Sequence, residues 1–173
     1  RIRLEPSPVL EFVAYLAGNG YDRAFALTLG PNGRIYAGGD TDSGNFPVTP
    51  GAVDTDFGPQ TNDSDGWVTC LRSDGNSLFY STFVGGHQFE EQIFAIAVDA
   101  LGSAVAVGRS GSNDFPTTPG AYQTSTDNTT FEGIVVRYAP DGKSLVYSTL
   151  LGVPLVWEEF RGVVLDAEGN AYV

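Results

Sequence analysis

Three carboxylates recur at one place in the chain, and their type and spacing could support metal binding. Asp22, Glu91 and Glu158 lie 69 and 67 residues apart, and each precedes a run of strand-forming residues. Carboxylate oxygens are the ligands that Ca²⁺ prefers, although six to eight oxygens must converge on one ion. One interpretation is an acidic ring that holds Ca²⁺ or another cation. The alternative is that each carboxylate accepts hydrogen bonds from the amides of its own turn.

Paired acids, a histidine and a cysteine are the other residues that a catalytic site would use. Glu90–Glu91 and Glu158–Glu159 match in type the paired carboxylates of glycosidases, but neighbouring residues in a strand point to opposite sides. His87 and Cys70 are the only residues of their kinds, and neither Gly-x-Ser-x-Gly nor His-Glu-x-x-His occurs. We therefore predict no catalytic residue and no cofactor apart from the Ca²⁺ considered above.

An aromatic surface is the remaining candidate for binding. Four of the five aromatic residues considered fall in strand-like runs, where packing is the expected role of a ring: Trp67, Tyr80, Tyr138 and Tyr147. Trp157 instead lies in a connecting segment. We therefore predict Trp157 as a residue that contacts a binding partner.

The elements that position these residues are set by an internal repeat. Residues 78–85 recur at 145–152, an offset of 67, with a weaker copy at 10–17. The string Phe-Pro-Val-Thr-Pro-Gly-Ala at 46–52 recurs as Phe-Pro-Thr-Thr-Pro-Gly-Ala at 115–121. Such self-similarity at a nearly constant period indicates a repeat architecture. The aromatic ring of each string, Phe46 or Phe115, is expected to be buried and to hold a long loop in place.

Each repeat contains four runs rich in Val, Ile, Tyr and Phe, which favour strands. In the second copy these runs lie at about 92–99, 103–109, 133–140 and 144–151, and only the connection between the second and third runs is long. Four antiparallel strands joined in this way are typical of a propeller blade. We predict an all-β fold, a β-propeller fragment of about two and a half four-stranded antiparallel blades. A β-solenoid is the alternative, although its repeats are usually much shorter.

The repeat also predicts the boundaries of the units. Residues 1–8 form an N-terminal extension or linker, and residues 9–173 a partial propeller. The partial propeller comprises strand four of one blade (9–16), two whole blades (23–84 and 92–151) and the first half of another (160–173). Because propellers usually close with about four to eight blades, we expect the remaining blades elsewhere in a longer chain.

The repeated strings resemble the bacterial SBBP β-propeller repeats. The resemblance rests on Tyr-Ser-Thr-(Phe/Leu)-(Val/Leu)-Gly, on Ala-Ile-Ala-Val-Asp at 95–99, and on Phe-Pro-Thr-Thr-Pro-Gly-Ala-Tyr-Gln-Thr at 115–124. The first copy departs from the pattern, with Val-Ala-Tyr at 13–15. Membership would imply an exported or cell-surface bacterial protein, and it implies no particular reaction.

Charge and composition limit the partners. The chain of 173 residues has a formal net charge of −12, which repels phosphate backbones and anionic lipid surfaces. We expect no nucleic acid and no membrane insertion, since no apolar run is long enough to cross a bilayer. The expected partners are other blades of the same chain and a protein or glycan at a cell surface.

These observations predict a non-enzymatic, extracellular scaffold or binding module. Two alternatives stay open. One is a structural subunit of a larger extracellular assembly, and the other is a propeller enzyme whose catalytic residues lie outside these 173 residues.

Overall fold

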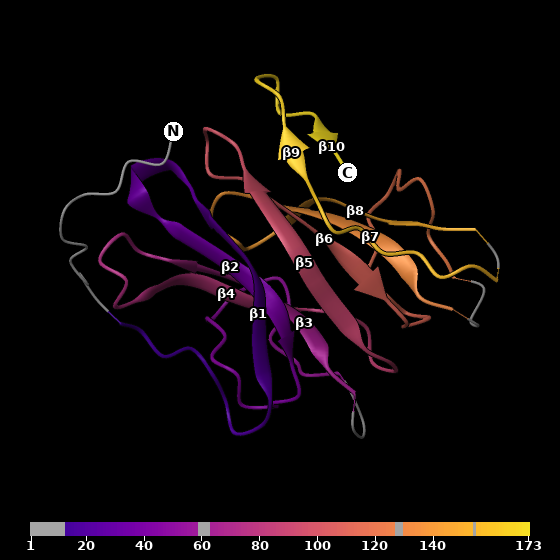
Figure 1. The fold of residues 1–173 in the computed structure, drawn as a ribbon, viewed down its shortest axis with the longest axis horizontal. Coiled ribbons are helices and arrows are strands. Elements are labelled where there is room, and N and C mark those ends of the chain that lie inside the picture. Colours follow the sequence, from indigo (N-terminus) through magenta and orange to yellow (C-terminus); the bar gives the residue numbers. More distant parts are fainter. Residues whose placement is uncertain (1–12, 59–62, 127–129, 154) are drawn as a thin grey trace, which may run out of the picture.

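The computed structural model describes residues 13–58, 63–126, 130–153 and 155–173, and within these ranges the chain folds into two sheets and a hairpin. Both sheets are four-stranded and antiparallel, with strands in chain order, as Figure 1 shows. This arrangement confirms the predicted all-β fold of four-stranded antiparallel units. The first sheet contains β1 (Asp22–Leu29), β2 (Ile35–Thr41), β3 (Asp65–Leu71) and β4 (Leu78–Val84), with a 3₁₀ turn (Pro31–Gly33) after β1. The second contains β5 (Glu91–Val98), β6 (Ala104–Ser110), β7 (Glu132–Tyr138) and β8 (Leu145–Leu151), and the hairpin contains β9 (Val164–Leu165) and β10 (Ala171–Tyr172).

The two sheets repeat each other residue by residue. β5 and β6 begin and end 69 residues after β1 and β2, while β7 and β8 follow β3 and β4 by 67. The irregularities repeat too, since a bulge between Ala24 and Ala26 in β1 has its counterpart between Ile93 and Ala95 in β5. The repeat found in the sequence is therefore a repeat of backbone structure.

Glycine turns close the hairpins between the third and fourth strands of each sheet. Gly75 and Gly142 have φ of 67° and 69°, a region that favours glycine because it has no Cβ. The amide of Gly75 donates to Arg72 O at 2.9 Å, and that of Gly142 donates to Ala139 O at the same distance. These tight turns fix the register in which the third and fourth strands of each sheet pair.

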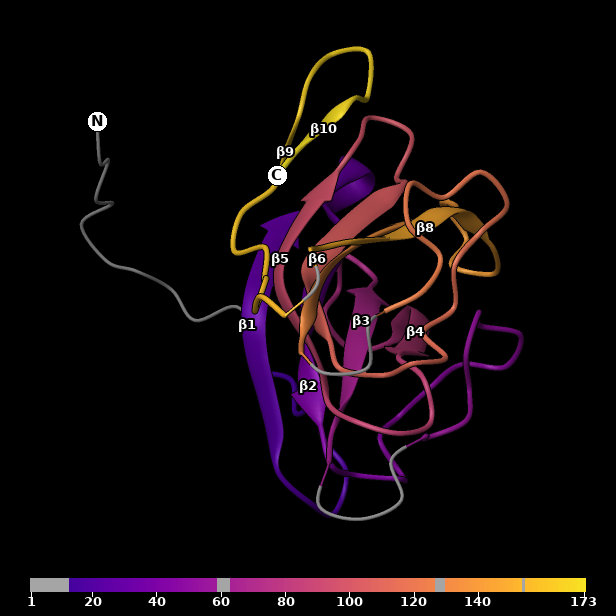
Figure 2. The same cartoon turned by 90° about the vertical axis from the view of Figure 1, so that its right-hand side faces the viewer.

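The main hydrophobic core lies between the two sheets. Strand β5 packs against β1, β2 and β3 of the first sheet, and Figure 2 shows the two sheets from the side. Tyr36, Val68 and Tyr80 of the first sheet are buried in one cluster with Ile93 and Ile96 of the second sheet. Phe115 belongs to the same cluster, so the predicted burial of this loop anchor is confirmed.

The outer faces of the pair carry smaller clusters. On the first sheet, the buried rings of Phe46 and Trp67 lie 5.0 Å apart between centroids, and Leu16 packs on their cluster. On the second sheet, Phe160 and Val163 pack on Val105 and Val107. The inner face of each sheet is thus buried, and its outer face is covered in part.

The predicted strand at 9–16 is not found in its described part. Residues 13–16 have no regular secondary structure. Residues 9–12, and the extension predicted at 1–8, lie outside the described residues.

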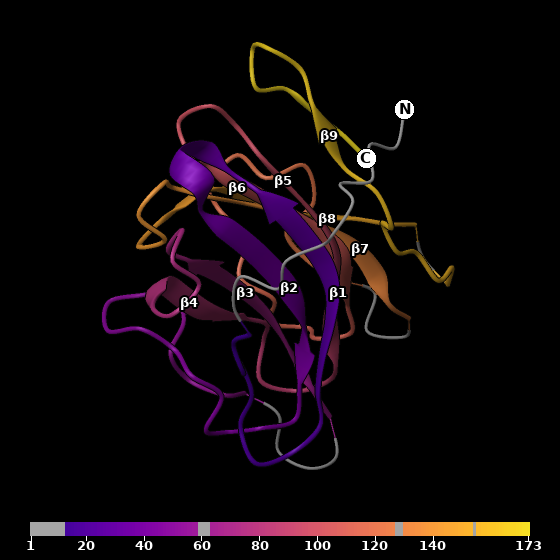
Figure 3. The same ribbon diagram turned by 60° about the vertical axis from the view of Figure 1, so that its left-hand side comes forward.

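At the other end, the hairpin of β9 and β10 follows the second sheet, and Figure 3 shows it projecting beyond β5. Its two strands fall within the predicted half unit at 160–173. No helix in the described part of the chain is long and apolar enough to span a membrane.

Candidate functional site

The first of the recurring acids, Asp22, is held in a local hydrogen-bond network at the start of β1. Its Oδ1 accepts a hydrogen bond from the hydroxyl of Thr41, and its Oδ2 accepts one from the amide of Gly18 at 2.8 Å. The hydroxyl of Thr41 in turn accepts the amide of Ser43 at 2.9 Å. Asp22 therefore joins β1 to the end of β2 and to the segment that precedes β1.

The second acid, Glu91, repeats this arrangement at the start of β5 and is fully buried. Its Oε1 accepts from the hydroxyl of Ser110 at 2.6 Å and from the amide of Ser112 at 3.2 Å. Its Oε2 is buried without a hydrogen-bond partner. Desolvation, with a contribution from the nearby Asp65, raises the pKa of Glu91 to about 8.

The third acid, Glu158, also binds its own connecting segment, since its Oε1 accepts the amide of Val153 at 3.1 Å. Each of the three acids thus caps a turn. In the described ranges no group of three or more His, Cys, Asp or Glu side chains is placed to hold a metal ion. The structure does not bring Asp22, Glu91 and Glu158 together, and their local contacts favour the capping interpretation over the cation ring.

Another buried acid, Asp65, was not singled out in the sequence. It begins β3, where its Oδ2 accepts the amide of Gly58 at 2.9 Å and its Oδ1 has no partner. Desolvation, reinforced by the charge of Asp54, raises the pKa of Asp65 to about 7. The signal that could have found Asp65 is its repeat position, because Glu132 occupies the same place at the start of β7.

Trp157 lies at the edge of a pocket of about 270 Å³ beside the second sheet. Its indole is 66% exposed and lies against Phe131, with ring centroids 5.2 Å apart. The guanidinium carbon of Arg109 lies 4.3 Å from the Phe131 ring centre and 5.4 Å from that of Trp157. The pocket is lined by Arg109, Phe131, Trp157, Glu158, Glu159 and Arg161.

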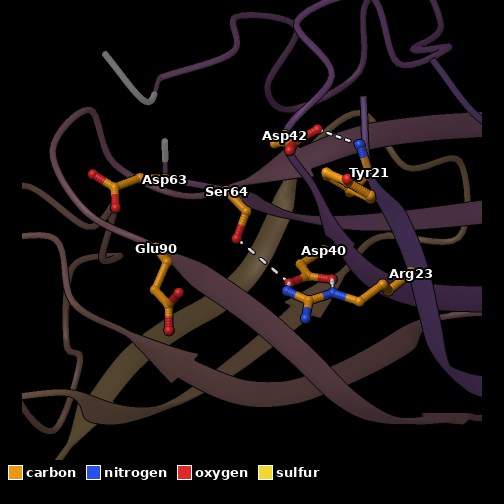
Figure 4. A pocket seen from close by; sticks show the side chains of 7 residues that line it. All are labelled: Tyr21, Arg23, Asp40, Asp42, Asp63, Ser64 and Glu90. Carbon is orange, nitrogen blue, oxygen red and sulfur yellow. Dashed lines mark hydrogen bonds and ion pairs between the residues drawn. The ribbon is translucent and has the colours of Figure 1, made fainter. Parts of the chain in front are cut away.

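The same place in the first sheet holds a second pocket, of about 230 Å³ (Figure 4). There Asp40 is bound by Arg23 and accepts a hydrogen bond from Gln92 Nε2 at 2.8 Å. Ser64 and Glu90 line it at the repeat positions of Phe131 and Trp157. The remaining lining residues are Tyr21, Asp42 and Asp63.

The two pockets therefore share a position in the repeat and differ in chemistry. Sequence reasoning found Trp157 but missed Arg109, Phe131 and Arg161. The available signal was the point where the repeat is broken, since Phe131 and Trp157 replace the polar residues Ser64 and Glu90.

The other residues with catalytic potential are in ordinary structural roles. Cys70 is buried, and desolvation raises the pKa of its thiol, which disfavours the reactive thiolate. The exposed His87 pairs with Asp114, with 3.0 Å between Nδ1 and Oδ2. Of the first acid pair, Glu90 binds Arg109 while Glu91 is buried, so these neighbours point apart as expected.

The second acid pair differs, because Glu158 and Glu159 both line the Trp157 pocket. Glu159 is held by Arg161, whose Nε donates to its Oε1 at 2.7 Å. Glu159 is therefore engaged in an ion pair within the pocket.

Comparisons with known proteins gave no match, either to a family model or to a curated protein sequence.

Proposed function

We propose that these residues form consecutive blades of an exported, non-enzymatic β-propeller of the SBBP type, which acts as a scaffold or binding module at a cell surface. The two sheets would be two blades, and the hairpin with the segment before it would begin the next. The proposal rests on how one repeat docks on another.

The observation that carries the proposal is a docking contact that recurs at the repeat period. The amide of Glu91, at the start of β5, donates to Ser64 O of the first sheet at 2.8 Å. One repeat later, the amide of Glu158 donates to Phe131 O of the second sheet at 3.0 Å. A contact that recurs between successive units with the same atoms is what a radial array of blades requires.

The hydrophobic contacts follow the same rule. Ile93 of β5 packs on the first sheet, and Phe160, 67 residues later, packs on the second. Successive units thus present equivalent residues to the unit before them. Each further unit would add one more sheet at the same angle.

The first sheet offers the matching unfilled surface. Ile96 of β5 is 8% exposed because it packs against the first sheet. Its counterpart Leu27 in β1 is 76% exposed, and Leu29, the counterpart of Val98, is 74% exposed. A preceding blade would cover these two leucines as the first sheet covers their counterparts.

The polar groups on the pocket side of the sheets support a scaffold role. Asp22, Glu91 and Glu158 are used to hold turns, and Arg109 is held between Glu90 and Glu159. Rigid turns that present loops and pockets are the usual construction of a recognition surface.

Fractionation of the host cell tests the proposed location and role. Surface biotinylation of intact cells and immunoblotting of membrane, medium and cytoplasmic fractions should find the protein at the surface or in the medium. Recovery in the cytoplasm alone, with no labelling of intact cells, would contradict an exported module.

A further inference from the structure

The pocket beside Trp157 combines a rigid aromatic platform with open space. Two-thirds of the Trp157 side chain is exposed, and Phe131 and the Arg109 guanidinium support it from behind. Arg161 is fixed in turn, with its guanidinium carbon 4.5 Å from the centre of the Phe94 ring. A ring held in this way loses little conformational freedom when a ligand stacks on it.

The charges within this pocket balance. Arg109 and Arg161 face Glu158 and Glu159, and Arg109 Nη1 lies 3.6 Å from Glu159 Oε2. The equivalent pocket in the first sheet has Arg23 as its only cation and four acids in its lining, Asp40, Asp42, Asp63 and Glu90. The Trp157 pocket is therefore suited to an uncharged ligand, whereas the first pocket would attract cations.

Two polar atoms of the lining residues lack partners. Arg109 Nε, a donor, and Glu158 Oε2, an acceptor, are both buried without a hydrogen bond. Leaving such groups unpaired is unfavourable. Both atoms are shielded from solvent, so donors and acceptors for a ligand would come from the exposed parts of Arg161 and Glu159.

The docking contacts occur in both repeats, whereas the aromatic pair Phe131 and Trp157 occurs only in the second. The docking contacts of Ser64 and Phe131 use backbone oxygens, so the side chain at this position is free to vary. Likewise Glu90 binds Arg109, while Trp157 at the same place is mostly exposed. The docking hydrogen bonds thus do not require aromatic side chains at these positions, and the exposed ring of Trp157 is available for recognition.

We propose that the Trp157 pocket binds a carbohydrate, with one sugar ring stacked on the indole and its hydroxyls paired with the arginine and glutamate side chains. A sugar is uncharged, has an apolar C–H face for an aromatic ring, and carries hydroxyls that both donate and accept. The pocket volume of about 270 Å³ lies near the lower end of small-ligand pockets and suits a single ring. This inference rests on the proposed extracellular role, which places the pocket among glycans.

Fluorescence titration of the 173-residue chain tests this binding. Trp157 is exposed and Trp67 is buried, so a ligand that stacks in the pocket changes the emission of Trp157 alone. The probes are glucose, galactose, mannose and N-acetylglucosamine, each raised to tens of millimolar, with sorbitol as an acyclic control. We expect at least one sugar to give a saturable change that sorbitol does not give.

Variants then locate the binding site. Saturation-transfer NMR, which does not depend on tryptophan emission, should show that Trp157→Ala weakens binding of that sugar at least tenfold. Glu159→Gln, which removes the charge that holds Arg161, should weaken it as well. Tyr21→Ala removes an exposed ring from the equivalent pocket of the first sheet and should leave binding unchanged.

Two results would overturn the inference. One is the absence of any saturable change with the four sugars while the circular dichroism spectrum is that of a folded β protein. The other is sugar binding that Trp157→Ala leaves intact. Either result would leave the exported scaffold standing, because cell fractionation tests that role separately.

Discussion

Asp65 Oδ1 and Glu91 Oε2 come from different sheets and approach the same point above Gly85. A Cβ on Gly85 would lie 2.6 Å from the first oxygen and 2.7 Å from the second. Both oxygens are buried without a partner, so two negative charges here would repel each other with little screening. Protonation of either carboxyl would relieve this repulsion.

At the equivalent place in the second repeat, a glutamine side chain makes hydrogen bonds. Gln123 Nε2 donates to Glu132 Oε2 at 2.6 Å, and Gln123 Oε1 accepts the amide of Gly152 at 2.9 Å. The counterpart of Gln123 in the first repeat is Asp54, which has no amide to donate and adds negative charge near Asp65. The first junction thus has unpaired acids where the second has a hydrogen-bonded glutamine.

Stability should fall as the pH rises from about 5 to 8. The pKa of Asp65 is raised to about 7 and that of Glu91 to about 8, whereas both are near 4 in an unfolded chain. Between these values the folded protein binds more protons than the unfolded one, so the free energy of unfolding decreases with pH. Thermal melts followed by circular dichroism should give a lower Tm at pH 8 than at pH 5.

The variant Glu91→Gln isolates this effect. Its amide keeps the acceptor for Ser110 and gains a donor for Asp65, so we expect a gain of about 1–3 kcal/mol at pH 8 and a flatter dependence of Tm on pH. A Tm that rises toward pH 8 in the wild type, or a variant less stable than wild type at pH 8, would refute the protonation of this pair. Asp99 and Asp114 do not contribute to a decrease of stability above pH 5, because their pKa values are lowered in the folded protein.

Truncating the loop anchor should destabilise the second sheet. Phe115 is buried in the core between the sheets, so Phe115→Ala is expected to cost on the order of 3 kcal/mol. Urea denaturation measures the change, with Tyr122→Ala in the same loop as the control because that ring is exposed. A loss for Phe115→Ala no larger than that of the control would show that the ring does not hold the loop.

Calcium should leave the melting temperature unchanged. Asp22, Glu91 and Glu158 each bind groups of their own turns, and an ion that binds only the folded state would raise the Tm by mass action. Melts in millimolar Ca²⁺ and in chelator should therefore coincide. A higher Tm in Ca²⁺, lost in Glu91→Gln, would instead restore the cation site.

The exposed leucines of β1 should make the 173-residue chain self-associate. Leu27 and Leu29 lie two residues apart on one face of the strand, and exposed apolar edge strands pair with other chains. Light scattering coupled to size-exclusion chromatography should show mass increasing with concentration. The double change Leu27→Ser and Leu29→Ser should keep the chain monomeric, whereas Leu101→Ser, on an exposed turn, should not. Association unaffected by the double change would place the contact elsewhere.

The strands and turns could be predicted because their signals are local and occur twice. β-branched and aromatic runs, together with glycines such as Gly75 and Gly142, specify each hairpin without reference to the rest of the fold. The burial of Phe115 could also be predicted, since its string recurs with Phe46.

The chemistry at the junctions could not be predicted, because it depends on residues far apart in the chain. Nothing local links Asp65 with Glu91, or Arg109 with Trp157, until the second sheet docks on the first and the final segment docks on the second. The hypothesis of an acid ring came from repeat position alone, which gives neither the distance between side chains nor their partners.

Electron microscopy of the intact protein tests the central claim most directly. If successive units dock as β5 docks on the first sheet and Phe160 on the second, class averages should show a closed disc with a central channel and radial blades of one size. An elongated rod, or a pair of sheets joined to unrelated domains, would contradict the propeller.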